Sequence, residues 1–163
     1  MGIQKSRYAS YKETPTYRNR NPLNIRWSAK NKWQGQTGCD TRGFAKFESL
    51  SYGYRAAVKI LHRYKINGWK TIAEVIRHWA PPTENSTESY IKTVCKLMAQ
   101  RQSELGTITP QTQVDLRNRN LVINLLLMMT KVETGWSTTA VLSMREYIGM
   151  GYDLAATSPE FFK

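Results

Sequence analysis

An almost unbroken run of apolar residues between positions 121 and 132 constrains the fold more than any other feature. Leu, Val, Ile and Met fill every position from 121 to 129 except Asn124, and Val132 continues the pattern. A helix that is apolar on all sides must be surrounded by the rest of the protein. The run is too short to span a bilayer, which needs about 20 apolar residues. We therefore predict a central core helix over 117–134 that Gly135 ends.

The remaining patterns predict a mainly α, or α+β, fold with a small β element in residues 23–48. The weakly alternating stretches 23–27 and 44–47 are expected to pair around a loop at 35–38. Residues 1–17 are expected to form a basic N-terminal arm, and residues 18–163 a single domain. Further helices are expected over 52–65, from Thr71 to Trp79 with a Thr71–Glu74 capping box, from Ser86 onward, and over 138–148.

Charge is distributed very unevenly along the chain. The 163 residues include 24 Lys and Arg against 12 Asp and Glu, a net charge of +12. Residues 1–70 hold 15 of these basic residues and 3 of the acidic ones, so they carry the whole excess. This asymmetry implies a polyanionic partner, such as nucleic acid, a membrane surface or the bacterial cell wall. The two Cys and two His lack metal-ligand spacing, so we expect no metal and no cofactor.

Glu133 is the strongest candidate for chemistry. It lies at the C-terminal end of the predicted core helix, against hydrocarbon and near the negative end of the helix dipole. Both effects raise the pKa of a carboxyl group. A raised pKa suits a general acid for glycosidic cleavage near neutral pH. The alternative is an exposed residue of the last turn without chemistry, and the residues alone leave both interpretations open.

Two further segments combine side chains that suit a polymer ligand. One runs from Trp79 to Tyr90 through a Pro-Pro turn, and would gather Glu84, Asn85 and Tyr90 near the start of a helix. The other, residues 18–27 with Trp33 close behind, supplies amide, guanidinium and indole groups. Such groups suit a sugar, but they equally suit single-stranded nucleic acid. Ordinary loops would also explain both segments.

Four segments together resemble the lysozyme-like superfamily, and most of all small phage lysins and virion-associated muralytic proteins. Residues 20–26 (RNPLNIR) resemble an Asn-Pro-Gly-Asn-Ile-Arg element, with Leu23 in place of Gly. Residues 43–49 (GFAKFES) form the second segment. Residues 79–91 resemble the Glu-Thr-x-x-Tyr-Val element of lytic transglycosylases, and residues 132–137 (VETGWS) resemble the Glu-Ser-Gly-Trp element of glucosaminidases.

The resemblance implies a lysozyme-like fold and a peptidoglycan-degrading enzyme of the lytic transglycosylase or lysozyme type. In those families the glutamate motif precedes the others, so its late position here implies a circular permutation. Glu133 would be the general acid/base and Tyr90 its neighbour, with no obvious second carboxylate. The substrate-binding candidates are Asn24, Arg26, Trp33, Glu84 and Asn85, and Glu84 is the next candidate acid. An endopeptidase on this scaffold stays open.

Bacterial peptidoglycan is then the expected partner, and other virion proteins are further candidates. The alternatives are a non-catalytic virion or wall-binding protein and a basic nucleic-acid-binding module. The N-terminus lacks a secretory signal, and no segment is long enough to span a membrane. We therefore expect a monomer in the phage virion or the host cytoplasm that reaches the wall after delivery or lysis.

Overall fold

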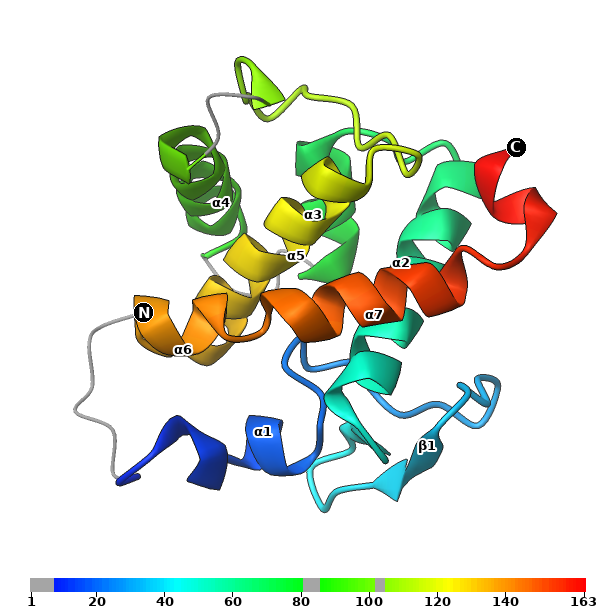
Figure 1. Cartoon of the computed structure of the whole chain (residues 1–163), viewed down its shortest axis with the longest axis vertical. Helices are drawn as coiled ribbons and strands as arrows, with labels where there is room; N and C mark the ends of the chain where they lie inside the picture. Colours follow the sequence, from blue (N-terminus) through cyan, green and yellow to red (C-terminus); the bar gives the residue numbers. More distant parts are fainter. Residues whose placement is uncertain (1–7, 81–85, 102–104) are drawn as a thin grey trace.

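Helix α5 (Arg119–Thr134) lies at the centre of the structure, as its apolar sequence requires (Figure 1). Every residue from Leu121 to Thr130 is buried. The Asn118 side chain caps the start of the helix by accepting a hydrogen bond from the Leu121 backbone N–H. Gly135 ends it in the left-handed conformation (φ 68°), and its N–H donates to the Lys131 carbonyl. The predicted bounds of this helix are therefore confirmed to within two residues.

The computed structural model describes residues 8–80, 86–101 and 105–163, and it is mainly helical with one small antiparallel sheet. In chain order the described elements are η1 (Tyr11–Glu13), α1 (Pro15–Arg18), β1 (Gln36–Cys39), β2 (Ala45–Phe47), α2 (Leu50–Ile66), α3 (Ile72–Trp79), α4 (Thr87–Arg101), α5, α6 (Thr138–Leu142), α7 (Arg145–Ala155) and η3 (Pro159–Phe162). The predicted class, mainly α with a minor β element, is confirmed.

Two of the predicted helices begin at side-chain caps, and a third begins next to the residue that was expected to start it. The Ser49 hydroxyl accepts from the Tyr52 backbone N–H at the start of α2. Thr71 and Glu74 form the expected capping box at the start of α3. Helix α4 begins directly after Ser86, although the residues from Pro81 to Asn85 lie outside the described ranges. Local chemistry therefore sets these boundaries before any tertiary contact is considered.

The C-terminal helix differs from the prediction. Instead of one helix over 138–148, the chain forms α6 and then α7, and α7 continues through Gly149 and Gly151. Figure 1 shows α7 lying across α2 and α5, and contacts between these helices are extensive. A Cβ added at Gly151 would lie 2.7 Å from the Arg55 backbone nitrogen and 2.8 Å from the Ser51 carbonyl oxygen of α2. Close helix packing, rather than helix termination, explains this glycine.

The sheet also differs from the expected pairing. Residues 36–38, predicted to be loop, belong to β1, which pairs with β2. The segment 23–27 lies beside residues 43–45 but forms only one isolated bridge, Arg26 with Phe44. Two features interrupt a regular strand there. Asn24 adopts a left-handed conformation (φ 54°), and the Asn21 side chain bonds both the N–H and the carbonyl of Ile25.

The described part of the expected arm packs against the helical body. Residues 1–7 lie outside the described ranges, and residues 8–17 include η1 and the start of α1. The Tyr11 ring lies 5.1 Å from the Trp136 ring, measured between centroids, and the Tyr17 ring lies 6.1 Å away. This segment therefore covers the chain directly after α5. Among the described helices, none is long and apolar enough to cross a membrane.

The packing of α7 on α2 yields a matched pair of glycine substitutions. Gly151→Ala should lower the free energy of unfolding by about 1–3 kcal/mol, because its Cβ would meet fixed backbone atoms. Gly149→Ala is the control, since its Cβ would meet the far end of the Arg119 side chain, which can move. Urea denaturation measures both. Equal losses for the two variants would contradict the close packing at Gly151.

Candidate active site

Glu133 lies where the core helix reaches the edge of the core, and two side chains from distant segments hold its carboxylate. The Asn24 side-chain amide donates to Oε1 over 3.0 Å and approaches the Glu133 backbone carbonyl at 3.4 Å. The Tyr90 hydroxyl donates to Oε2 over 3.0 Å. The fold therefore brings together three of the residues that the sequence singled out, from the 19–27 loop, α4 and the end of α5.

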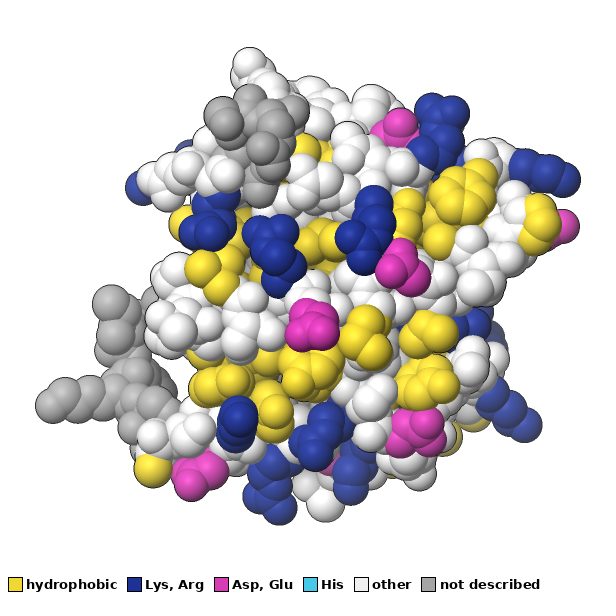
Figure 2. Space-filling view, in the orientation of Figure 1, with side chains coloured by type: hydrophobic (Ala, Val, Ile, Leu, Met, Phe, Trp, Pro, Cys, Tyr) yellow, Lys and Arg dark blue, Asp and Glu magenta, His cyan; other side chains and the backbone are white. Residues whose placement is uncertain are grey.

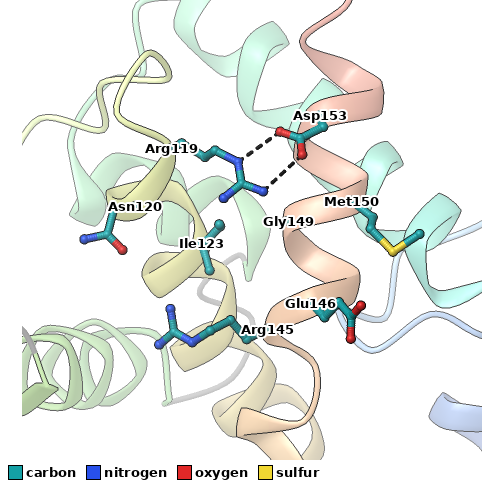
Figure 3. Close-up of a pocket in the computed structure, with 8 residues that line it drawn as sticks. All are labelled: Arg119, Asn120, Ile123, Arg145, Glu146, Gly149, Met150 and Asp153. Atoms are coloured by element: carbon teal, nitrogen blue, oxygen red, sulfur yellow. Dashed lines mark hydrogen bonds and ion pairs between the residues drawn. The ribbon is translucent and has the colours of Figure 1, made fainter.

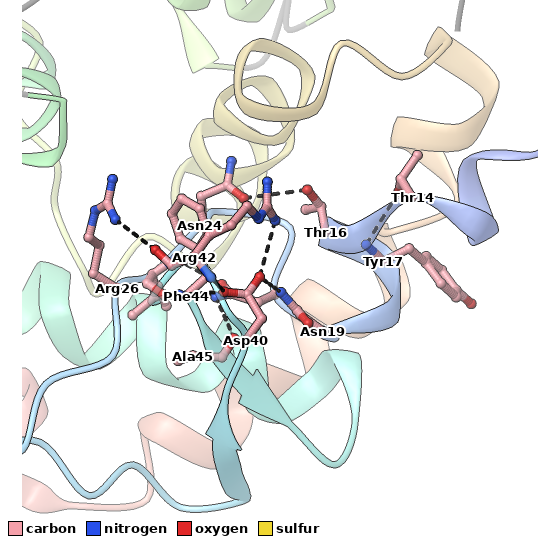
Figure 4. A network of polar contacts seen from close by, with 12 residues as sticks. Thr14, Thr16, Tyr17, Asn19, Asn24, Arg26, Asp40, Arg42, Phe44 and Ala45 are labelled. Carbon is pink, nitrogen blue, oxygen red and sulfur yellow. Dashed lines mark hydrogen bonds and ion pairs between the residues drawn. The ribbon is translucent and has the colours of Figure 1, made fainter. Parts of the chain in front are cut away.

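The loop before the sheet fixes the position of Asn24. Its neighbours Leu23 and Ile25 are buried, so the polar side chain between them is directed away from the core. The Trp79 indole N–H donates to the Leu23 carbonyl over 3.2 Å. The Thr16 hydroxyl donates to the Asn24 Oδ1 atom over 3.4 Å, a contact drawn in Figure 4. With Oδ1 accepting this bond, the amide N–H₂ of Asn24 is directed at Glu133.

Tyr90 reaches Glu133 from the first turn of α4. The ring is almost completely buried, with 6% of its surface exposed. Burial, the negative charge of Glu133 and the hydrogen bond to it together raise the pKa of Tyr90 well above its usual value. The phenol therefore stays protonated at neutral pH and acts as a hydrogen-bond donor to the carboxylate.

Opposing effects set the pKa of Glu133. Burial is the larger effect and raises the pKa, because removal from water penalises the charged form. The hydrogen bonds from Asn24 and Tyr90 lower it, because they stabilise the carboxylate, but they do not cancel the effect of burial. The net result is a pKa above the usual value for Glu. The carboxyl can therefore hold a proton closer to neutral pH than an exposed glutamate can.

The sequence patterns did not predict which residues position Asn24. The Thr16 hydroxyl bonds its side chain and the Trp79 indole bonds the preceding carbonyl, so both act through Asn24 rather than on Glu133 itself. Thr14 followed by Pro15 is a recognisable helix start, and its hydroxyl does cap α1. That pattern could have shown that the region is folded. It could not have shown that Thr16 would meet Asn24.

The other predicted binding residues have varied surroundings. Arg26 is exposed and lies two residues after Asn24. Trp33 is 8% exposed and belongs to the core, with the Arg63 guanidinium 4.5 Å from its ring. Its ring is therefore covered rather than presented as a sugar-stacking face. Glu84 and Asn85 lie outside the described residues.

Two carboxylates that could have partnered Glu133 are engaged locally. Asp40 accepts hydrogen bonds from the backbone N–H groups of Arg42 and Phe44 and from the Asn19 side chain. Partial burial works to raise the pKa of Asp40, but these bonds and the Arg42 side chain hold it well below the usual range. Asp115 binds Arg117 in the same manner. Both carboxylates therefore stabilise the turns in which they lie through hydrogen bonds to nearby residues.

Two surface concavities lie away from the triad. One, of about 510 Å³, lies between α5 and α7 and is lined by Arg119, Arg145, Glu146 and Asp153 among others (Figure 3). Arg119 is paired there with Asp153. Ile123 of this concavity precedes Glu133 by ten residues, about 15 Å along a helix. The other, of about 210 Å³, includes Lys131 and Met128 of α5. Within the described ranges, no cluster of three or more His, Cys, Asp or Glu residues could hold a metal ion.

Comparison with known proteins gives one informative similarity. No protein-family model matches the chain. The chain is similar to "Protein P5" of Pseudoalteromonas phage PM2, with 38% identity over 81 residues that cover 47% of this chain. These residues cover 51% of the phage protein, so the chain spans about half the length of this curated relative. The similarity connects the chain to a phage protein but says nothing about its chemistry.

The raised pKa of Glu133 makes stability depend on pH in a defined direction. A carboxyl with a higher pKa in the folded state contributes stability below its unfolded pKa, about 4.3, and loses that contribution as pH rises through the folded pKa. Glu133→Gln should therefore be more stable than the wild type at pH 7 and should lose this advantage at pH 3. Urea denaturation at both pH values measures the difference. The exposed Glu146→Gln is the control, and a destabilised Glu133→Gln at pH 7 would contradict the effect of burial.

Removing one donor should shift the same pKa further. Tyr90→Phe deletes the hydroxyl that stabilises the ionised form of Glu133, so the pKa of Glu133 should rise above its wild-type value. Carbon-detected NMR titration of the glutamate side-chain carboxyls measures this value. Tyr147→Phe, on the exposed surface of α7, should leave it unchanged. A fall in the pKa of Glu133 in Tyr90→Phe would show that the hydroxyl does not act as its donor.

Proposed function

We propose that this protein is a peptidoglycan-degrading enzyme that cleaves the glycan strand, with Glu133 as its general acid and base. The observation that carries the proposal is the half-buried carboxyl of Glu133, which has a raised pKa and is held by Asn24 and Tyr90. An oriented acid with this property is what glycosidic cleavage near neutral pH requires. The resemblance of the segments that carry these three residues to muralytic proteins supports the same class of substrate.

In the first step, the Glu133 carboxyl gives its proton to the glycosidic oxygen between two amino sugars. The bond from that oxygen to the anomeric carbon breaks, and the leaving sugar departs with a hydroxyl group. Positive charge develops on the anomeric carbon and its ring oxygen. Tyr90 and Asn24 then donate to the carboxylate that has formed, so the fold stabilises the product of proton transfer without a change of geometry.

We favour the lytic transglycosylase type of reaction over hydrolysis, because Glu133 can carry it without a second carboxylate. Hydrolases need a second carboxylate about 5–9.5 Å from the first, whereas Asp40 and Asp115 are bound to local partners. In the second step Glu133 would remove the proton from a hydroxyl of the same sugar, whose oxygen then bonds to the anomeric carbon. The product is an anhydro sugar, and Glu133 regains the proton that it gave away.

The fold and the remaining substrate contacts belong to the same proposal. Residues 18–163 would form a lysozyme-like catalytic domain in a circularly permuted order, because the glutamate follows the other motifs. Arg26 would contact the glycan strand near Asn24, whereas Glu84 and Asn85, which lie outside the described residues, stay predicted contacts. The core position of Trp33 gives it a structural role in this arrangement rather than a contact with sugar.

The similarity to a phage protein supports a place for this enzyme in the phage life cycle. A virion-associated enzyme would open the wall during entry, and an enzyme made in the host would act at lysis. Both routes lead to peptidoglycan, and in the first route other virion proteins would be partners. The basic first 70 residues would hold the protein to an anionic wall, with an attraction that salt weakens. Figure 2 shows basic side chains along the lower edge of the molecule, over the part of the chain that precedes α2.

The test is mass spectrometry of fragments released from purified peptidoglycan. We expect the wild type to release fragments ending in anhydro sugars and Glu133→Gln to release them more slowly by roughly 100- to 10,000-fold. Glu146→Gln is the matched control, because it neutralises an exposed glutamate on α7 and should keep wild-type activity.

Other products would each change the proposal in a defined way. Reducing-end sugars would indicate hydrolysis and a second carboxylate, and released peptides would indicate an endopeptidase. If the wild type releases nothing from walls that another lysin digests, the enzyme proposal is wrong. Salt-sensitive binding to nucleic acid, unchanged in Glu133→Gln, would then support a nucleic-acid-binding module, and wall binding without cleavage a virion protein without activity.

A further inference from the structure

Two arginines share one aromatic ring, and one of them belongs to the loop that carries Asn24. The guanidinium carbon of Arg26 lies 4.6 Å from the centroid of the Phe44 ring, and that of Arg42 lies 4.9 Å from it. The two positive charges are therefore closer to one another than about 10 Å, the screening distance at 0.1 M salt. Like charges this close repel each other, so their proximity needs an explanation from the structure or from a ligand.

The backbone around the ring brings the two arginines together. Arg26 and Phe44 form an antiparallel bridge, and the Arg26 side chain donates to the Arg42 carbonyl over 3.4 Å. Asp40 accepts from the Arg42 guanidinium over 3.2 Å and from the Phe44 backbone N–H over 2.9 Å. Figure 4 shows this network around Asp40. Both guanidinium groups are thus positioned before any ligand arrives.

The network leaves an excess of positive charge that faces solvent. Asp40 is the one carboxylate that the structure pairs with either arginine within the described ranges, so it balances one charge of the two. The Arg42 side chain is 52% exposed, and Arg26 is exposed as well. Guanidinium groups offer several N–H donors in a planar fork that matches an oxyanion. The pair therefore has donors available for a carboxylate or phosphate.

The location relates the pair to Glu133. Arg26 follows Asn24 by two residues, a separation of at most about 7 Å between Cα atoms. Asn24 in turn bonds the Glu133 carboxylate, whose hydrogen bonds come from Asn24 and Tyr90 rather than from an arginine. The pair thus includes a residue of the loop that carries Asn24, and neither arginine is among the groups that set the pKa of the acid. An anionic group that the substrate carries close to the scissile bond would contact the arginine pair.

We propose that Arg26 and Arg42 form a subsite for the carboxylates of the peptide side chains that peptidoglycan carries on its glycan strand. This inference rests on the proposed function. The glycan backbone offers neutral hydroxyl and amide groups, whereas the free carboxylates belong to the peptides attached to every second sugar. An arginine pair beside the cleavage position would therefore favour strands that still carry their peptides. Phosphates of wall-linked polymers share the same chemistry and are tested separately.

The experiment measures binding in a background that cannot cleave, so that it is independent of activity. Glu133→Gln is compared with Glu133→Gln/Arg26→Gln/Arg42→Gln in sedimentation with three materials. These are peptidoglycan bearing peptides, glycan strands whose peptides an amidase has removed and whose freed lactyl carboxylates have then been converted to neutral amides, and peptide-bearing walls from which phosphate polymers have been extracted. The control is Glu133→Gln/Arg77→Gln/Arg117→Gln, which removes the same charge from two exposed arginines paired with acids elsewhere.

We expect the Arg26/Arg42 variant to bind peptide-bearing strands about 10- to 100-fold more weakly, because charge-assisted hydrogen bonds are lost. Its binding to stripped strands should equal that of the parent, and extraction of phosphate polymers should not change the result. The control variant should bind peptide-bearing strands and stripped strands slightly more weakly than the parent, and to the same extent. Arg26→Lys/Arg42→Lys, which keeps the charge but not the fork and so guards against a folding defect, should fall between the two.

Several outcomes would overturn the subsite. An equal loss on peptide-bearing and stripped strands would mean general attraction to the wall, and a loss that disappears after extraction would assign the pair to phosphate. Unchanged binding of all variants would also exclude the subsite. These outcomes differ from failure of the proposed function, in which the Glu133→Gln parent itself binds neither kind of strand and the wild type releases no fragments.

Discussion

The burial of α5 is the constraint on which the rest of the structure depends. A helix with ten consecutive buried positions must be covered on every side, and α2, α4, α6 and α7 supply that cover directly or through one another. Near its end this helix brings the carboxyl of Glu133 to the edge of the core, within two residues of the terminating Gly135. The position of the candidate acid is thus a consequence of how the core is built.

A single buried helix could not orient that carboxyl without help from elsewhere in the chain. The help comes from 109 residues away in sequence, where the loop around Asn24 is held by hydrogen bonds rather than by strand pairing. The Asn21 side chain donates to the Ile25 carbonyl and accepts from the Ile25 backbone N–H. The Trp79 indole N–H donates to the Leu23 carbonyl. The left-handed backbone at Asn24 is stable because these neighbours fix it, and it is also what directs the amide at Glu133.

Sequence patterns predicted what local chemistry decides and missed what tertiary packing decides. Short motifs predicted the bounds of α5 and the capping box at Thr71. They also singled out Glu133, Tyr90 and Asn24 as candidate site residues. The continuation of α7 through Gly151 does not, because the helix is stabilised there by contact with α2 that no neighbouring residue encodes. The core position of Trp33 was missed for the same reason, since an aromatic in a basic loop has the same sequence whether it faces solvent or core.

The groups around Glu133 explain how its pKa stays raised although the loop that carries Asn24 also holds arginines. A cation in direct contact would favour the carboxylate and lower its pKa, so Glu133 would hold its proton only at a lower pH. The groups that touch Glu133 are instead an amide and a phenol, which orient it with neutral donors while burial keeps the pKa raised. The nearby arginines are held by Phe44 and Asp40 instead. The positive charge can then attract an anionic polymer without lowering the pKa of the acid that is proposed to cleave it.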